Sequence, residues 1–442
     1  AAPAPAPPAA PAPAPAPAEV VVKATPMCDY VLAGVKQTLH ALISLETIAS
    51  KEEKPRHPVD LCLVLDRSGS MSGDRLDCAK KAIIMVMKAL SSKDCVHLVQ
   101  YDHTVDVVFE NMDITKLATM EAKVKKIEAG GSTNIGGGLE KAYEILRQRS
   151  SVASTKRVFL FSDGMNNAGN HRSTSDFSKL VSSACKDSIS TASFGIGDGF
   201  NEELMSTIAE VGCSDYFFIQ TAKDIERIVA AALQFLLTTL GKEVALTVRG
   251  QNGAVVTKVF GHEDASKPIP LGFLSYGTTR TLVVEYTAGV GEKSGTSVDL
   301  LKYSLEYTSV ADGARVCVAG SMAQRVTESD ADAAGVNPEV QTEVEFQRAA
   351  EREEAALDML RQGRVEEAVA EMQSTSNHFG GLLKKNWDAL PEAKRGYMVF
   401  QQAKMEECTR ESMASGGSAA VCKKMHMGLK QKRKNDVGYG LI

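Results

Sequence analysis

The sequence predicts an α/β fold, in which a doubly wound, mostly parallel sheet is inserted in a β-sandwich and followed by a helical C-terminal region. Three observations predict it. Short apolar runs alternate with segments of helical spacing through the middle of the chain, as expected of parallel strands covered by helices on both faces. Period-two alternation flanks this stretch on both sides, which indicates sheets with one buried face. Helical spacing returns from Pro338 onward.

The composition excludes several classes of protein. The 442 residues are 44% hydrophobic and 24% charged, which is enough apolar material for a sizeable core. A formal net charge of -5 argues against a general nucleic-acid binder. No apolar run reaches the roughly 18 residues that a membrane-spanning helix needs. The nine cysteines form no C-x-x-C pair and the chain has no glycosylation sequon, so we expect an intracellular, cytoplasmic location.

Shifts in composition divide the chain into six segments. Residues 1–18 are only Ala and Pro, so they are expected to be an extended, solvated tail. Two isolated strands are only marginally stable in water, so the N-terminal strands are expected to join the later β-rich sheet. The six expected segments are 1–18 (tail), 19–54 (N-terminal strands), 55–240 (α/β domain), 241–335 (β-sandwich), 336–415 (helical region) and 416–442 (basic tail).

The individual elements follow from the same patterns. In the α/β domain, strands are expected at Leu61–Leu65, Val96–Tyr101, Val105–Phe109, Arg157–Phe161, Ser190–Gly195 and Tyr216–Ile219. Helices are expected at Leu76–Leu90, Ile114–Ile127, Ile135–Arg149, Phe177–Asp187, Glu202–Val211 and Ala222–Leu240. Later strands are expected at Val244–Val248, Val255–Phe260, Thr281–Tyr286, Leu301–Tyr307 and Arg315–Val318. A helical hairpin that turns at Gly363 and a helix over Pro391–Met413 follow, and the basic tail is expected to be disordered.

One segment carries recognisable chemistry. The apolar strand that begins at Val59 ends on Asp66, and Ser68 and Ser70 follow at alternate positions before a helix. Ligands in open α/β sheets bind at the carboxyl ends of such strands. One carboxylate and two hydroxyls on a tight loop make a cluster of hard oxygen donors, which suits Mg²⁺. Two further loops can reach the same edge, because a Gly-rich loop carries Thr133 and another strand ends before Asp163.

This pattern resembles the metal-ion-dependent adhesion site of von Willebrand factor A domains. Its parts are Asp66-x-Ser68-x-Ser70, Thr133 and Ser162-Asp163-Gly164. The chain looks similar to a soluble microbial and plant branch of that family, related to chloride-channel accessory proteins and inter-alpha-trypsin inhibitor heavy chains. The resemblance is strong over residues 55–240 and implies a Rossmann-like fold.

The resemblance also implies roles for these residues. Ser68, Ser70 and, in one state, Thr133 would bind the ion directly, whereas Asp66 and Asp163 would bind it through water. The expected ion is Mg²⁺, with Mn²⁺ or Ca²⁺ as alternatives. A protein partner would complete the coordination with an Asp or Glu side chain, and no nucleic acid, membrane span or catalytic residue is expected. The partner's identity and the oligomeric state do not follow from the sequence.

Two other functions remain open at this point. A metal-assisted hydrolase could use Asp66 as a nucleophile, but such enzymes need a second carboxylate two residues later, where this chain has Ser68. A serine nucleophile would need a histidine base, and neither His97, His103 nor His171 lies in a triad motif. The second alternative is a scaffold subunit whose metal only stabilises the loops.

Overall fold

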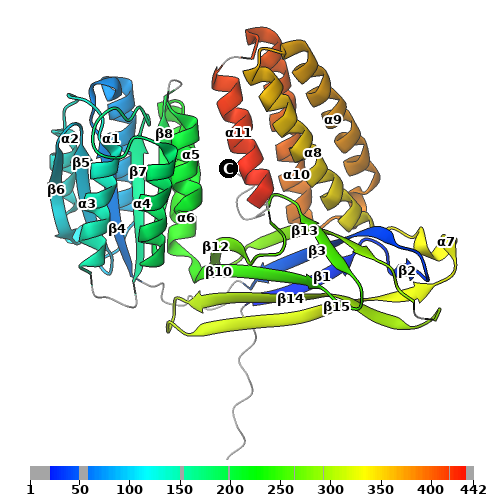
Figure 1. The fold of residues 1–442 in the computed structure, drawn as a ribbon. Helices are drawn as coiled ribbons and strands as arrows, with labels where there is room; N and C mark the ends of the chain where they lie inside the picture. Colours follow the sequence, from blue (N-terminus) through cyan, green and yellow to red (C-terminus); the bar gives the residue numbers. More distant parts are fainter. Residues whose placement is uncertain are drawn as a thin grey trace, which may run out of the picture.

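The protein is described here by a computed structural model, which covers residues 20–48, 58–149, 154–197, 200–262, 264–291, 293–417 and 419–434. The α/β domain, the β-sandwich and the helical unit are visible as three bodies (Figure 1). The fold class expected from the sequence is confirmed. The expected N-terminal tail of residues 1–18 lies outside the described residues.

A six-stranded sheet forms the centre of the α/β domain, in the order β6-β5-β4-β7-β8-β9. All neighbouring strands are parallel except the edge strand β6, which runs antiparallel to β5. Every residue of β4 and β8 is buried, as expected for strands covered on both faces. The strands are β4 (Val59–Asp66), β5 (Cys95–Tyr101), β6 (Val105–Met112), β7 (Thr155–Ser162), β8 (Ile189–Ile196) and β9 (Tyr216–Ile219).

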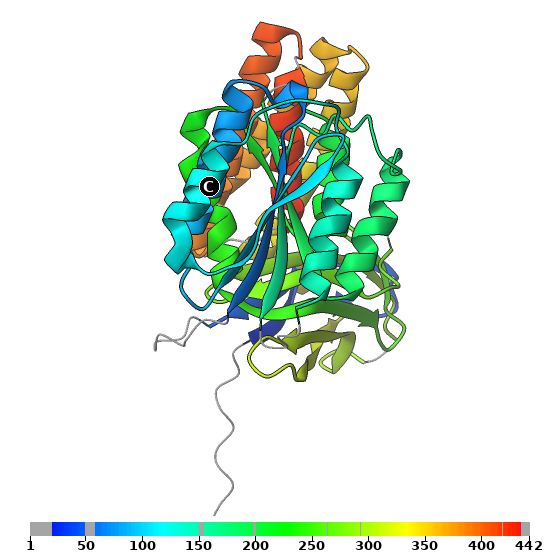
Figure 2. The same cartoon turned by 90° about the vertical axis from the view of Figure 1, so that its left-hand side faces the viewer.

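Helices cover both faces of this sheet (Figure 2), and the buried apolar side chains form a separate core on each face. The first face is covered by α1 (Asp74–Lys88), α2 (Leu117–Lys125) and α6 (Ile225–Leu237), and the second by α3 (Ile135–Arg147), α4 (Thr174–Lys186) and α5 (Glu202–Val211). Short 3-10 turns lie at η1 (Gly69–Met71), η2 (Ile114–Lys116) and η3 (Ala222–Asp224). The helix expected over Ala222–Leu240 ends earlier, at Leu237, because Thr239 and Leu240 already belong to the next strand, where Thr239 pairs with Ser275.

The β-sandwich combines two segments that are far apart in the sequence. One sheet has the order β1-β3-β13-β11 and the other β12-β10-β14-β15-β2, and both contribute to one apolar core. β3 lies between β1 and β13, so the N-terminal strands do join the later sheet. The strands are β1 (Val20–Pro26), β2 (Tyr30–Leu32), β3 (Gln37–Thr47), β10 (Thr239–Gly250), β11 (Val255–Val259), β12 (Ile269–Ser275), β13 (Thr279–Ala288), β14 (Ser297–Ser309) and β15 (Arg315–Thr327).

The helical unit contains a hairpin of two long helices, which turns at Gly363 with a φ of 78°. Its elements are α8 (Pro338–Arg361), α9 (Val365–Lys385), η4 (Trp387–Ala389), α10 (Glu392–Ser415) and α11 (Ala419–Lys434), and the short α7 (Asp330–Ala333) precedes them. The expectation of a disordered basic tail is wrong over α11. Val421, Met425 and Leu429 are buried there at a spacing of four residues, which packs one face of α11 on the other helices.

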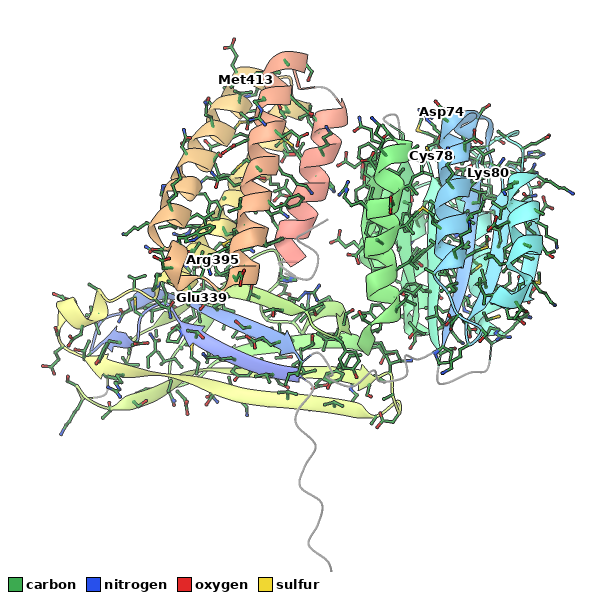
Figure 3. The ribbon with its side chains drawn as sticks, turned by 180° about the vertical axis from the view of Figure 1, so that it is seen from behind. Asp74, Cys78, Lys80, Glu339, Arg395 and Met413 are labelled. Carbon is green, nitrogen blue, oxygen red and sulfur yellow. The ribbon has the colours of Figure 1, made fainter. Side chains whose placement is uncertain are left out.

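The helical unit contacts both other bodies. Its base packs on the sandwich, where Val340 and Val344 of α8 join Leu42 and Val283 in a separate apolar cluster. Figure 3 shows Glu339 and Arg395 at this base and Met413 at the opposite end. Within the part of the chain that the structure describes, no helix is both long and apolar enough to cross a bilayer.

Candidate metal centre

The first loop of the candidate centre follows β4 and begins with Asp66. Asp66 is fully buried, and its carboxylate accepts hydrogen bonds from the Ser68 backbone N–H at 2.9 Å and from the Ser162 hydroxyl at 2.6 Å. Ser68 is buried whereas Ser70 is exposed, and their hydroxyl oxygens lie 3.2 Å apart. This loop therefore places two adjacent hydroxyls near a buried carboxylate, and the outer hydroxyl is open to solvent.

The second loop precedes α3 and contains Thr133, which is buried. It is joined to the first loop by the Gly69 N–H, which donates to the Gly131 carbonyl oxygen at 3.0 Å. It is joined to the third loop by the Thr133 N–H, which donates to Asn167 Oδ1 at 2.7 Å. The loop that carries Thr133 is therefore held by hydrogen bonds to both neighbouring loops.

The third loop follows β7 and begins with Asp163, which is fully buried. Asp163 Oδ1 accepts from the Met165 N–H at 3.2 Å, and Oδ2 lies 3.4 Å from a guanidinium nitrogen of Arg75. The Asp163 carbonyl oxygen accepts from the N–H of Asn201, the N-cap of α5, at 2.8 Å. The Ser162 hydroxyl next to Asp163 connects this loop directly to Asp66.

The structure thus brings all three predicted loops together at the carboxyl edge of the sheet. The five residues expected from the sequence lie on these loops, which hydrogen bonds join in pairs; they are Asp66, Ser68, Ser70, Thr133 and Asp163. Parallel strands place the loops that follow them at one edge, so this convergence is a consequence of the topology.

The electrostatics of the centre favour a bound cation. Burial raises the pKa of Asp66 to about 6, and the charge of Asp163 raises it further, against hydrogen bonds from Ser162 and Ser68 that lower it. Among the described residues no ion pair to Asp66 is present, and Asp163 has only the partly exposed Arg75. Buried carboxylates are costly without a compensating charge. Two carboxylates and three hydroxyls, all oxygen donors, therefore fit a divalent ion such as Mg²⁺.

Three neighbours of the centre were not assigned a role from the sequence. Ser162 belongs to the motif, and the structure shows that its hydroxyl donates to Asp66. Arg75, in the first turn of α1, contacts Asp163 and donates to the Ser70 carbonyl oxygen at 3.0 Å. Asn167 holds Thr133. The only available signal was proximity in the sequence, because each lies within a few residues of a predicted ligand.

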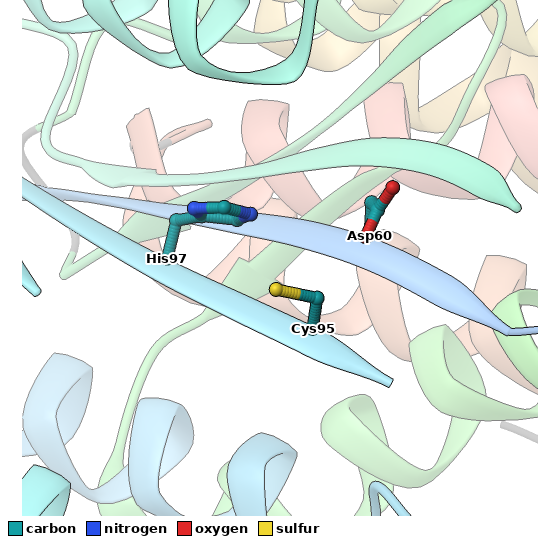
Figure 4. Close-up of side chains that lie close together, drawn as sticks. All are labelled: Asp60, Cys95 and His97. Atoms are coloured by element: carbon teal, nitrogen blue, oxygen red, sulfur yellow. The ribbon is translucent and has the colours of Figure 1, made fainter. Parts of the chain in front are cut away.

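A second cluster of metal-ligating residue types lies at the opposite end of β4 and β5. Asp60, Cys95 and His97 converge there, with their ligand atoms within 4.8 Å of one another (Figure 4). His97 is fully buried, and its Nε2 has no hydrogen-bond partner. Carboxylate, thiolate and imidazole together are a ligand set that Zn²⁺ uses in proteins.

The protonation of this cluster argues against a metal. His97 Nδ1 accepts the backbone N–H of Asn111 at 3.2 Å, so in the neutral imidazole the proton is on Nε2, which then cannot ligate. The Asp60 carboxylate already has two partners within the chain. It accepts a hydrogen bond from the Ser154 hydroxyl at 2.8 Å and lies 3.4 Å from a guanidinium nitrogen of Arg149. We therefore interpret the cluster as a buried polar network of the fold and not as a metal site.

A family model for the von Willebrand factor type A domain matches residues 60–231, which span the three loops described above. These residues form a von Willebrand factor A domain. The family resemblance expected from the sequence is therefore confirmed. Domains of this type commonly mediate protein–protein interactions and are typically not enzymes.

Curated proteins that are similar to this chain share mainly this domain. The uncharacterized protein YfbK of Escherichia coli K12 is 26% identical over 276 residues, which cover 60% of this chain and 47% of that protein. Inter-alpha-trypsin inhibitor heavy chain H2 of Mus musculus is 30% identical over 160 residues, or 34% of this chain and 17% of that one. The chain thus spans less than half the length of these relatives.

Two solved structures resemble the whole chain and not the A domain alone. A von Willebrand factor type A protein from Catenulispora acidiphila matches with a TM-score of 0.66 at 16% identity. The match covers 86% of this chain and 89% of that protein. The ArnB paralog VWA2 from Sulfolobus acidocaldarius matches with a TM-score of 0.62 at 14% identity. This match covers 96% of this chain and 99% of that protein. At these identities the likeness shows a shared fold, which includes the parts outside the A domain.

Proposed function

We propose that this chain is a non-enzymatic protein that binds a protein partner through a divalent cation. The ion is Mg²⁺, with Mn²⁺ or Ca²⁺ as alternatives, and Asp66, Ser68, Ser70, Thr133 and Asp163 hold it. The partner contributes an Asp or Glu side chain to the ion. The observation that carries the proposal is the convergence of three hydrogen-bonded loops, with two fully buried carboxylates, at one edge of the sheet.

The chemistry of the donor set supports a site that is completed by a partner. Mg²⁺ dehydrates reluctantly and usually keeps several waters, so a protein seldom encloses it completely. If both carboxylates act through water, the directly bound oxygens are neutral hydroxyls. The charge of the ion is then poorly offset, and an incoming carboxylate gains a strong ionic contact.

The position of the centre supports access by a large partner. Ser70 is exposed, and Met165 beside Asp163 is 49% exposed. The start of α1, marked by Asp74, lies at the end of the domain that faces away from the β-sandwich (Figure 3). A protein surface can therefore approach the loops from this end without displacing the sandwich.

The contacts of the two serines favour binding over hydrolysis. Among the described hydrogen bonds, the hydroxyls of Ser68 and Ser70 bond to each other and neither bonds to a histidine. A serine nucleophile needs a base within hydrogen-bond reach. All nine cysteines are free thiols, which supports the intracellular location that we propose.

The test compares two buried aspartates at opposite ends of the same strand. Asp66→Asn removes the carboxylate of the proposed centre but keeps its shape, whereas Asp60→Asn is the matched control away from the centre. We expect calorimetry with Mg²⁺ and Mn²⁺ to show about 10- to 100-fold weaker binding for Asp66→Asn, and no change for Asp60→Asn. The fold should persist, because the neutral side chain removes a buried charge. Equal metal affinity in both variants contradicts the proposed ligands.

Thr133 tests whether the ion recognises the partner. In Thr133→Ala the ion keeps its other ligands, and the backbone bond to Asn167 is retained, so metal affinity should fall only slightly. Partner capture should fall more strongly, because the loop that responds to the incoming carboxylate has lost its ligand. The amount of partner captured on the immobilised intact chain and on immobilised Thr133→Ala, each in Mg²⁺ and in EDTA, measures this difference. Capture that persists undiminished in EDTA shows that the ion is only structural, and turnover of phosphoesters or acyl esters favours a hydrolase.

A further inference from the structure

Cys185 and Cys213 lie together where α4 and α5 end. Cys185 Sγ donates to the Val211 carbonyl oxygen at 3.1 Å, and Cys213 Sγ lies 3.9 Å from the same oxygen. The pKa of the Cys185 thiol is raised first of all by its neighbour Cys213, so the two thiols interact. Both side chains are half-buried, so small molecules in solvent can reach the pair. The two sulfurs are 28 positions apart in the sequence, and only the packing of α4 against α5 brings them together.

The backbone at Cys213 makes this residue unusual. The N–H of Cys213 donates to the Glu210 carbonyl oxygen and the N–H of Ser214 to that of Ala209, which is the Schellman arrangement at the end of a helix. Cys213 occupies the left-handed position of this turn, with a φ of 51°. Glycine is favoured there, because a Cβ atom is strained in this conformation. Strain retained at one position is a reason to look for a role of its side chain.

We propose that Cys185 and Cys213 are a redox-responsive dithiol, which a hydroperoxide oxidises to an intramolecular disulfide. The thiolate of Cys213 attacks the terminal oxygen of the hydroperoxide, which breaks the O–O bond and gives a sulfenic acid and an alcohol or water. The sulfur of Cys185 then attacks the sulfenic sulfur and loses its proton, and hydroxide leaves as water. Two thiols are oxidised and one hydroperoxide is reduced, and an excess of a thiol reductant reverses the reaction.

The order of these steps follows from the environment of Cys185. The Cys185 thiol donates its proton to the Val211 carbonyl oxygen at 3.1 Å, and its neighbour Cys213 and, after it, burial raise the pKa of this thiol, so we assign Cys185 to the second step. Fully buried thiols such as Cys62 have no access to solvent. Cys317 is exposed, and its thiol lies 3.5 Å from the Ser304 hydroxyl. The oxidation of Cys317 can therefore be compared with that of the Cys185–Cys213 pair in the same protein.

The disulfide would form at the boundary between the A domain and the β-sandwich. A Cβ atom added to Gly272 of β12 would lie 3.1 Å from the Cys213 carbonyl oxygen, so the turn touches the sandwich. Nearby, the Ser188 hydroxyl donates to Glu243 at 2.8 Å. Oxidation would tie the ends of α4 and α5 together at this boundary, far from the metal loops. The inference is therefore independent of the proposed metal function.

The experiment uses the full reduced chain and hydrogen peroxide. We expect the count of titratable thiols to fall from nine to seven and a 185–213 cross-linked peptide to appear in a non-reducing digest, with both effects reversed by dithiothreitol. Cys213→Gly is the sharpest variant, because it removes the thiol and relieves the backbone strain, so it should fold. It should form no disulfide, and Cys185→Ser should behave in the same way.

Cys317→Ser serves as the matched control and should retain the cross-link. The proposal is overturned if a peroxide dose that oxidises Cys317 leaves peptides 185 and 213 unlinked. It is also overturned if the two thiols are lost as separate sulfinic acids, or if Cys213→Gly still loses two thiols. Each outcome is read by mass spectrometry on folded protein and does not depend on metal binding.

Discussion

His97 is a buried histidine that the fold keeps neutral. It lies inside β5 with none of its surface exposed, and its Nδ1 accepts the Asn111 N–H. Burial lowers its pKa from 6.5 to about 4; Asp60 raises the pKa and Arg149 lowers it, and both effects are smaller. The sequence interpretation placed His97 outside any catalytic triad, and the buried position agrees with that view.

The lowered pKa predicts an acid-dependent loss of stability. Between pH 6.5 and about 4 the unfolded chain binds a proton at this histidine and the folded chain does not, so the free energy of unfolding falls as pH falls. The full loss is about 3 kcal/mol. In His97→Asn the side-chain oxygen can still accept from Asn111, and this part of the pH dependence should vanish. Urea unfolding at several pH values measures it, with the exposed His103→Asn as control. Identical slopes in all three proteins contradict the prediction.

The ligand residues of the candidate centre could be predicted from the sequence because the motif and the topology constrain each other. Asp66 is the last residue of one buried strand and Asp163 follows another, and parallel strands end at one edge. The contacts of Arg75 and Asn167 could not be predicted, because they depend on side-chain directions in loops of irregular backbone. The Asp60 network was also missed, since its members come from separate strands and form no sequence motif.

At the scale of elements, a buried ion pair of the helical unit lies where this unit packs on the sandwich. Lys394 of α10 lies 2.5 Å from a Glu343 carboxylate oxygen of α8, and both side chains are almost completely buried. The Lys394 ammonium also donates to the Thr281 hydroxyl of β13 at 2.7 Å. Three elements from two bodies therefore meet at one charged contact. Such a pair is costly to bury, but it is more costly to break.

Removing one partner of this pair should destabilise the chain strongly. Glu343→Gln leaves the Lys394 ammonium buried without its counter-charge, and we expect the free energy of unfolding to fall by about 3–5 kcal/mol. Lys394→Met should cost a similar amount. The double variant should recover much of the loss, because no uncompensated charge remains. A double-mutant cycle by urea unfolding measures the coupling, and additive single effects would show that the two side chains do not interact.

The elements that the sequence failed to predict share a cause. In α11 the apolar positions Val421, Met425 and Leu429 have helical spacing, but the basic residues between them suggested a solvated tail. In β12 Pro270 and Gly272 interrupt the alternation, and no strand was expected there. β12 lies at the edge of its sheet, where a proline is tolerated because one side of the strand needs no partner. In both elements, packing against the rest of the chain decides the structure, and the local sequence pattern does not.

At the scale of the molecule, the A domain is an insertion between two halves of one sandwich. β3 precedes the domain and β10 follows it, and the pairing of β3 with β13 closes the sandwich around the insertion. The helical unit also reaches the A domain, because Glu202 of α5 lies 3.1 Å from His426 and 3.8 Å from Arg361. Glu202 follows Asn201, whose backbone N–H donates to the Asp163 carbonyl oxygen, so the helical unit contacts the residue next to one that holds the third loop.

This arrangement predicts opposite behaviour for two fragments. Both apolar cores of the A domain are built from its own residues, so a fragment of residues 55–240 should fold cooperatively. In a fragment of residues 243–326, β13 loses its partner β3 and becomes an unpaired edge that carries Leu282 and Val284. Unpaired apolar edges join other chains, so this fragment should aggregate. Size-exclusion chromatography and thermal unfolding distinguish the two, and a monomeric, cooperatively unfolding 243–326 fragment would show that the sandwich does not need its N-terminal strands.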